Sequence, residues 1–274
     1  MLVSIITVNF NHLEGLKRTY ESVVNQTFGD YEWIVIDGGS TDGSREFIEQ
    51  HQDHFAYWCS EKDNGIYHAM NKGIRQAKGE YLNFMNAGDT FAGGEALAMV
   101  FGERRTADIL YGYMPIGNIN GKLHSSFRNM KKILQWYDLY PYTLPHQASF
   151  IKRVLFEEVG MYDEVCRVVS DSLWFSKAIL IHKASYEFIP NKIAIFEGGG
   201  LGSTGIQANE RDRQKQGVFP DYVHDEDFQF LRKMSLVHSY KLTAFLFRVV
   251  YRIAWEFDKR QREAELRKLS EHFN

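Results

Sequence analysis

The sequence predicts an α/β fold: a mostly parallel sheet flanked by helices and followed by a C-terminal helical extension. Within residues 1–91, short apolar runs rich in β-branched and aromatic residues alternate with segments of helical period. This alternation is typical of units in which a helix crosses over between two parallel strands. Near the end of the chain, an apolar stripe with helical spacing runs from Leu242 to Phe257 and indicates the extension.

The first half of the chain predicts a regular series of strands and helices. Val3 to Val8 is a near-continuous apolar run, as expected for a central parallel strand. Asn11 is placed to cap the following helix, with Glu14 in position for a capping box. The expected elements are strands over 3–8, 33–36, 55–59 and 81–85, and helices over 13–24, 44–48 and 66–77.

The second half is less regular. Asn120-Gly121 indicates a hairpin turn, and residues 141–145 are expected to form a loop. Strands are expected over 109–113, 147–151, 186–189 and 193–196, and helices over 97–101, 154–159 and 170–180. A glycine-rich loop follows over 198–205.

Composition and charge exclude several classes of protein. The net charge of −3 gives no global basic field, so we expect no nucleic-acid partner. The two cysteines, Cys59 and Cys166, have neither metal-ligand nor disulfide-framework spacing. The N-terminus reads as a strand rather than a signal peptide, and no apolar run reaches the ~20 residues of a membrane span. We therefore expect a cytoplasmic protein.

Three aspartates follow the ends of predicted strands or begin a predicted helix. Asp37 is placed to accept hydrogen bonds from a nucleobase or ribose, or else to cap the next helix through an Asx turn. Asp89 could hold a divalent metal that bridges two phosphates, or cap a helix. Asp171 could act as a general base toward a sugar hydroxyl, or serve as a plain N-cap.

Several segments, in this order and spacing, resemble family 2 glycosyltransferases. Segments 3–11, 26–28 and 32–43 are similar to the start of that family. Segment 63–74, Asp-Asn-Gly-Ile-Tyr-His-Ala-Met-Asn-Lys-Gly-Ile, resembles the helix that the family places beside its donor. Segment 77–89 is similar to the strand that leads to the family's metal motif. The resemblance extends over residues 1–200 and is most specific before residue 91.

The resemblance implies a GT-A fold and inverting transfer of a sugar from a nucleotide-diphosphate donor, with a UDP-sugar favoured. It implies a catalytic domain over 1–220, with a nucleotide-sugar-binding half over 1–114 and an acceptor-binding half over 115–220. The extension then occupies 221–274. The acceptor is expected to be a glycan or a lipid-linked molecule in bacterial surface polysaccharide synthesis.

The resemblance also implies roles for individual residues. Asp89 would hold Mg²⁺ or Mn²⁺, and Asp171 would be the catalytic base. The acceptor cleft would be built near His146 and Gln147. The residues expected at the nucleotide are Thr7, Asn9 and Asp37 in the nucleoside pocket, with Asp63, Asn71 and Lys72 nearby.

Two positions depart from the family pattern. Many members carry a second acid where this chain has Gly38, and another where it has Gly88. The nucleobase contact is therefore open, and Asp89 alone, with phosphate oxygens and water, would hold the metal. No Gln-x-x-Arg-Trp motif is present, so one sugar is expected per acceptor. The glycine-rich loop, with Ser203, either closes over the diphosphate or forms a flexible loop.

The C-terminal helix and the overall function each leave alternatives. The helix could pack on the catalytic domain, form a homodimer, or make a peripheral contact with the inner membrane face through its basic flank. Because of Gly38 and Gly88, the alternative function is a catalytically impaired nucleotide-sugar-binding or scaffold protein. A nucleotidyltransferase needs a glycine-rich, basic phosphate loop that residues 7–16 lack, and a dehydrogenase needs a G-x-G-x-x-G turn that is absent.

Overall fold

The computed structural model describes residues 1–117, 123–124, 139, 144–198, 210 and 218. The chain divides into two units, Met1–Tyr222 and Val223–Asn274. The second unit, and with it the predicted C-terminal helix, lies outside the described residues, as do Asn120-Gly121 and Ser203. The boundaries expected for the domain halves stay predictions.

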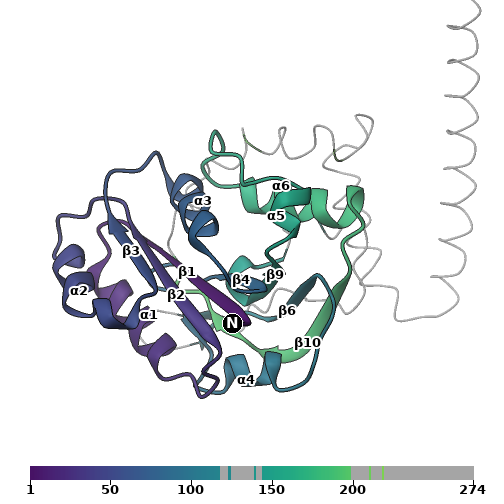
Figure 1. The fold of residues 1–274 in the computed structure, drawn as a ribbon, viewed down its shortest axis with the longest axis horizontal. Helices are drawn as coiled ribbons and strands as arrows, with labels where there is room; N and C mark the ends of the chain where they lie inside the picture. Colours follow the sequence, from purple (N-terminus) through teal and green to yellow (C-terminus); the bar gives the residue numbers. More distant parts are fainter. Residues whose placement is uncertain (118–122, 125–138, 140–143, 199–209, 211–217, 219–274) are drawn as a thin grey trace, which may run out of the picture. The chain divides into compact units, whose positions relative to one another are not determined.

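A seven-stranded sheet organises the first unit (Figure 1). Its strand order is β10-β6-β9-β4-β1-β2-β3. All neighbouring pairs are parallel except those of β9, which runs antiparallel to both β4 and β6. The sheet strands are β1 (Val3–Asn9), β2 (Tyr31–Asp37), β3 (Tyr57–Ser60), β4 (Tyr81–Phe84), β6 (Ile109–Tyr113), β9 (Ser149–Lys152) and β10 (Tyr186–Lys192).

Helices cover both faces of this sheet (Figure 1). Odd-numbered residues of β1 and β2 form one core cluster with side chains of α1, α2 and α4. On the opposite face, Ile6 packs against Gly73 of α3, and Phe84 contacts Phe156 of α5. The helices are α1 (Leu13–Val24), α2 (Ser44–Gln50), α3 (Ile66–Gln76), α4 (Ala96–Phe101), α5 (Leu155–Glu158) and α6 (Ser170–Ser176).

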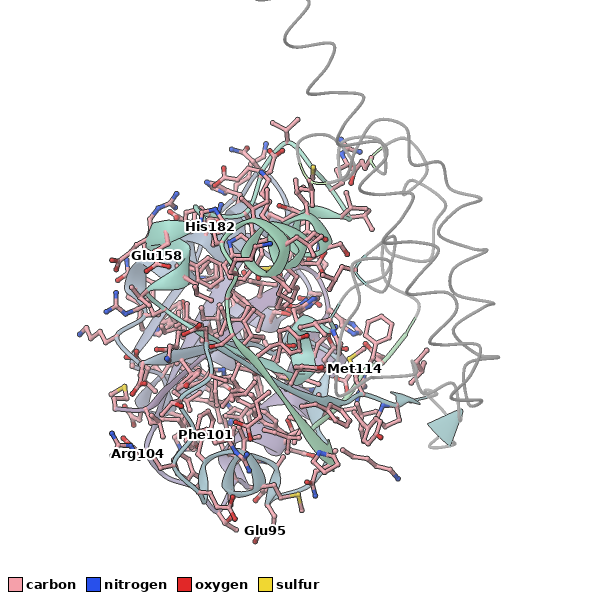
Figure 2. The ribbon with its side chains drawn as sticks, turned by 90° about the vertical axis from the view of Figure 1, so that its right-hand side faces the viewer. Glu95, Phe101, Arg104, Met114, Glu158 and His182 are labelled. Carbon is pink, nitrogen blue, oxygen red and sulfur yellow. The ribbon has the colours of Figure 1, made fainter. Side chains whose placement is uncertain are left out.

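Short elements complete the first unit. Figure 2 shows Glu158 of α5 and His182, which follows the π-helix η4, in the upper part of the view and Phe101 of α4 in the lower part. Two antiparallel pairs, β5 with β11 and β7 with β8, lie outside the main sheet. The bounds are η1 (Gln52–His54), β5 (Thr90–Phe91), β7 (Ile116–Gly117), β8 (Leu123–His124), η3 (His146–Ala148), η4 (Lys177–Ile181) and β11 (Ala194–Ile195).

The expected α/β architecture is confirmed, and three local predictions are corrected. Asn11 does not cap α1: it has a left-handed φ of 47°, and its Oδ1 accepts the N–H of Thr41 at 2.8 Å. The N–H of Leu13 instead donates to Asp42 Oδ2 at 2.8 Å, so an acid from the β2–α2 loop serves the helix start. The strand expected to begin at residue 147 begins at Ser149, after the 3₁₀ turn η3. The helix expected over 170–180 ends at Ser176, and the π-helix η4 begins at the next residue, Lys177.

Candidate active site

Three neighbouring parallel strands, β4, β1 and β2, deliver polar residues to one edge of the sheet. Asn9 ends β1 and lies opposite Asp37, which ends β2. The chain after β4 stays alongside β1, because the N–H of Ala87 donates to the carbonyl of Val8 at 3.0 Å. Since the carboxyl ends of these strands coincide, Asp37 and Asp89 lie at the edge where ligands bind in open α/β sheets.

Asp37 organises the loop after β2. Its side chain is fully buried. Its oxygens accept hydrogen bonds from Asn9 Nδ2 (2.7 Å), the backbone N–H groups of Gly39 (3.2 Å) and Ser40 (2.9 Å), and the hydroxyls of Ser40 (2.5 Å) and Ser60 (2.6 Å). Five donors contact the carboxylate and hold the loop. A nucleoside contact by Asp37 stays a prediction.

Two other residues expected at the nucleotide have structural partners. Thr7 is fully buried, and its hydroxyl accepts a hydrogen bond from the indole of Trp33 at 2.9 Å. Asn71 is 1% exposed and joins α3 to the segment before α6. Its Nδ2 donates to the Tyr162 carbonyl (2.9 Å) and to Glu164 (2.8 Å), and its Oδ1 accepts the Tyr162 N–H (3.1 Å). A nucleoside contact by either residue stays a prediction.

Asp63 and Lys72 lie near the end of β2, on the turn before α3 and on α3 itself. Asp63 Oδ1 accepts the backbone N–H of Gly65 at 2.9 Å. Lys72 Nζ donates to Glu61 at 2.8 Å. Burial lowers the pKa of Lys72, but Glu61 outweighs it and the pKa lies above its ordinary value. Lys72 is therefore a cation at neutral pH.

Asp89 is a buried carboxylate with two hydrogen-bond donors. It is 4% exposed. Oδ2 accepts from Gln147 Nε2 at 2.9 Å, and Oδ1 accepts the backbone N–H of Glu197 at 3.0 Å. Burial raises the pKa of Asp89 to about 6, even though both hydrogen bonds favour the charged form. A nearby cation would offset this cost of burying the charge.

A second carboxylate, that of Glu197, lies against Gly88. A Cβ placed on Gly88 would come within 1.9 Å of Glu197 Oε2, and Gly88 has a φ of +99°. Glu197 Oε2 is 2.7 Å from His12 Nε2, and Oε1 forms an ion pair with Arg18. Because Gly88 has no side chain, an acid from the far end of β11 stands beside Asp89.

Each carboxylate oxygen of Asp171, the expected base, contacts a different side chain. Its Oδ1 accepts the hydroxyl of Tyr67 at 2.9 Å, and its Oδ2 lies 3.1 Å from His146 Nδ1. Burial raises the pKa of Asp171, but the hydrogen bonds from His146 and Tyr67 outweigh it, and the pKa lies below its ordinary value. The carboxylate is therefore ionised at neutral pH, as a general base requires.

One turn, η3, connects the two acids. His146 contacts Asp171, and the next residue, Gln147, contacts Asp89. His146 Nε2 lies 3.1 Å from Asn86 Nδ2, on the loop that carries Asp89. The neutral tautomer with its proton on Nδ1 satisfies both histidine contacts. The structure thus brings Asp89 and Asp171 into one network and places Gln147, at 4% exposure, on Asp89. Acceptor contacts by His146 and Gln147 stay predictions.

Three contributors were not anticipated from the sequence. Tyr67 and Glu197 contact the acids as described above. Glu210 accepts the backbone N–H groups of Arg167 (2.7 Å), Val168 (2.8 Å) and Val169 (3.3 Å), which orders the chain just before Asp171. Of the three, only Glu197 could have been predicted from the sequence pattern. Like Asp37, it is an acid that follows a strand and precedes glycine. Tyr67 and Glu210 act through tertiary contacts.

Solved structures with similar folds define the fold type of the chain. TarS of S. aureus, solved in complex with UDP-GlcNAc, matches with a TM-score of 0.57 and 19% identity, covering 73% of this chain and 59% of that one. The mannosyltransferase PcManGT of Pyrobaculum calidifontis, in complex with GDP-Man and Mn²⁺, matches with a TM-score of 0.56 and 20% identity, covering 73% and 58%. The chain spans about three-fifths of the length of these structures. Its fold is of the GT-A type.

Sequence comparison gives the family. Residues 4–167, more than half of the chain, match Glycosyl transferase family 2. An uncharacterized glycosyltransferase of Mycobacterium tuberculosis is 35% identical over 188 residues, covering 65% of this chain and 69% of the relative. A PGL/p-HBAD biosynthesis glycosyltransferase of Mycobacterium bovis is 30% identical over 219 residues, covering 74% and 80%. The chain belongs to the family 2 glycosyltransferases.

Proposed function

We propose that this glycosyltransferase is metal-dependent and inverting, and that it moves one sugar from a nucleotide-diphosphate donor to a hydroxyl acceptor. The observation that carries the proposal is the η3 turn, which links a buried acid at the sheet edge to an ionised acid at the start of α6. A metal-holding acid beside a base suits in-line attack by the acceptor hydroxyl on the anomeric carbon, with the diphosphate departing.

The chemistry of Asp89 fits a divalent cation. The carboxylate is buried and its pKa is raised, so a positive charge beside it would be favourable. No group of three or more His, Cys, Asp or Glu side chains that could hold a metal is present among the described residues. This suits Mg²⁺ or Mn²⁺ held by Asp89 together with donor phosphates and water. When bound, such an ion neutralises charge on the leaving diphosphate.

The relatives support the proposed donor and acceptor. Structures of similar fold were solved with UDP-GlcNAc and with GDP-Man, which supports a nucleotide-sugar donor. The preference for a UDP-sugar stays a prediction. The relative named for PGL/p-HBAD biosynthesis supports a glycan or lipid-linked acceptor in surface glycan synthesis. None of the described helices combines the length and apolar character needed to cross a bilayer. We include in the proposal a peripheral contact between the C-terminal helix and the membrane surface.

Two measurements on the full chain test the proposed function. Thermal shift with a panel of nucleotide sugars, with and without Mn²⁺, should give stabilisation that needs both the metal and a matching donor. Slow metal-dependent hydrolysis of that donor should follow in the absence of acceptor. Binding without any hydrolysis would favour the scaffold alternative. Metal-insensitive stabilisation would remove Asp89 from the role of metal ligand.

A further inference from the structure

Gly38 stands where many family members have a second acid, and another carboxylate occupies its surroundings. A Cβ built on Gly38 would lie 2.7 Å from Asp63 Oδ2 and 3.1 Å from Cδ2 of Phe10. A side chain at position 38 and the observed position of the Asp63 carboxylate therefore exclude each other. The acid that the sequence lacks after β2 is replaced in space by one from the turn before α3.

Asp63 has one oxygen that is fixed and one that is spare. Oδ1 accepts the Gly65 N–H at 2.9 Å, which orients the carboxylate as in an Asx turn. Oδ2 accepts no hydrogen bond within the part of the chain that the structure describes. The residue is half-buried, and the charge of Lys72 acts on it. The Asx turn explains the position of Oδ1. No contact of the turn explains why Oδ2 is directed toward Gly38.

The neighbours of Asp63 indicate what the spare oxygen contacts. Phe10, the residue after β1, is 65% exposed, which is unusual for a phenylalanine beside a buried sheet. Asp37 is fully buried, and its two oxygens already accept five hydrogen bonds. Asp63, on the turn before α3, therefore has a carboxylate oxygen that can accept a hydrogen bond from a flat ligand.

We propose that Asp63 reads the nucleobase of the donor, with Oδ2 accepting a hydrogen bond from a ring N–H. The inference rests on the proposed nucleotide-sugar donor and narrows its base. Uracil presents N3–H and guanine presents N1–H, whereas cytosine N3 and adenine N1 are acceptors that a carboxylate repels. Asp63 therefore selects uracil or guanine diphosphates, and it compensates for the acid absent at Gly38.

Calorimetry on the full chain with UDP, GDP, CDP and ADP in the presence of Mn²⁺ tests the wild-type site. A hydrogen bond to a charged group corresponds to about a 10- to 100-fold change in affinity. UDP or GDP should bind more tightly than CDP and ADP by about that factor. UDP methylated at N3 should lose the same factor, and this comparison needs no variant. Equal affinity for UDP and its N3-methyl form would overturn the proposal.

Asp63→Asn tests the residue itself. Its amide keeps the Gly65 contact, so the fold should be retained, and its N–H matches cytosine N3. UDP affinity should fall about tenfold or more while CDP affinity holds or rises. Asp53→Asn, on the exposed turn η1, is the matched control and should change neither. If Asp63→Asn weakened UDP and CDP binding by the same factor, the proposal that Asp63 recognises the nucleobase would be overturned. If no nucleotide binds the wild type, the proposed donor site fails as well.

Discussion

Gln147 donates a hydrogen bond of 2.9 Å from its Nε2 to Oδ2 of Asp89, and the residue before it, His146, contacts Asp171. Adjacent residues on one 3₁₀ turn thus serve the two acids expected to perform different tasks. The turn is itself held, because the Gln147 carbonyl accepts Asn83 Nδ2 of β4 at 2.9 Å. The spacing between the loop that carries Asp89 and the start of α6, which carries Asp171, is therefore set by the sheet.

Asp171→Asn should abolish sugar transfer while leaving donor binding largely intact. An amide cannot take the acceptor proton, and general-base catalysis typically contributes about 10²- to 10⁴-fold. Transfer rates and nucleotide affinity by calorimetry measure the two effects separately. Asp53→Asn, remote from the site, is the control and should keep full activity. A variant at Asp171 that retains wild-type turnover would remove this residue from the base role.

Tyr67→Phe should move the acidic limb of the rate profile to higher pH. The hydroxyl of Tyr67 is one of the donors that hold the pKa of Asp171 below its ordinary value, and the proposed base works only when ionised. Removing the donor raises that pKa, so activity is lost at a higher pH as the solution is acidified. At high pH, where Asp171 stays ionised in both proteins, their rates should converge. A uniform fall at every pH would indicate a purely structural role.

Asp89→Asn should stabilise the metal-free protein at neutral pH. Burial raises the pKa of Asp89 from 3.8 to about 6, so the folded state binds the proton more tightly than the unfolded chain. Stability is therefore lost as pH rises from about 4 to about 6, by up to ~3 kcal/mol. The amide carries no such cost. Thermal melts should show a higher Tm for the variant at pH 8 and equal values at pH 4.

The same variant separates stability from function. Mn²⁺ with a nucleotide should raise the Tm of the wild type and leave that of Asp89→Asn unchanged, because binding to the folded state alone stabilises it. A variant that is less stable than wild type by the same amount at pH 8 and pH 4 would contradict the raised pKa. Stabilisation of the variant by Mn²⁺ would contradict the metal site.

The sequence predicted the parts of the fold that rest on periodicity. The strands ending at Asn9, Asp37 and Phe84 are apolar runs, and the acids beyond them were visible as carboxylates at strand ends. The spacing of residues along the chain could not predict which hydrogen-bond partner each polar side chain finds in the fold. Asn11 was expected to cap α1, but Asp42, from the next loop, does so. Thr7 and Asn71 matched positions expected near the nucleotide, yet their observed hydrogen bonds are internal.

The glycines taken as lost acids illustrate the same limit. Gly38 and Gly88 are absences in a one-dimensional pattern, and nothing in that pattern shows which side chain enters the space they leave. Asp63 is 25 positions from Gly38, and Glu197 is 109 positions from Gly88. Only a folded chain brings these carboxylates against the glycines. The scaffold alternative rested on counting acids in sequence, and the structure weakens that argument because carboxylates lie beside both positions.

Gly88→Ala should destabilise the protein, and the cost should depend on Glu197. The new methyl group would lie 1.9 Å from Glu197 Oε2, on a residue whose φ of +99° already disfavours a side chain. The carboxylate must then leave His12 and Arg18. In a Glu197→Ala background the collision with Glu197 is gone, and the backbone strain and the 3.0 Å approach of the new methyl group to His12 Nε2 remain. Gly88→Ala should therefore cost about 1–2 kcal/mol less there.

Urea denaturation of the wild type, both single variants and the double variant measures this coupling. Gly160→Ala is the matched control: Gly160 has a φ of +96°, and a Cβ there would meet nothing within 4 Å. It should lose similar stability from strain, by the same amount with Glu197 present or absent. Additive losses for Gly88→Ala and Glu197→Ala would show that the carboxylate does not depend on the missing side chain. A coupling seen equally with Gly160→Ala would assign the effect to general destabilisation rather than to contact between Glu197 and Gly88.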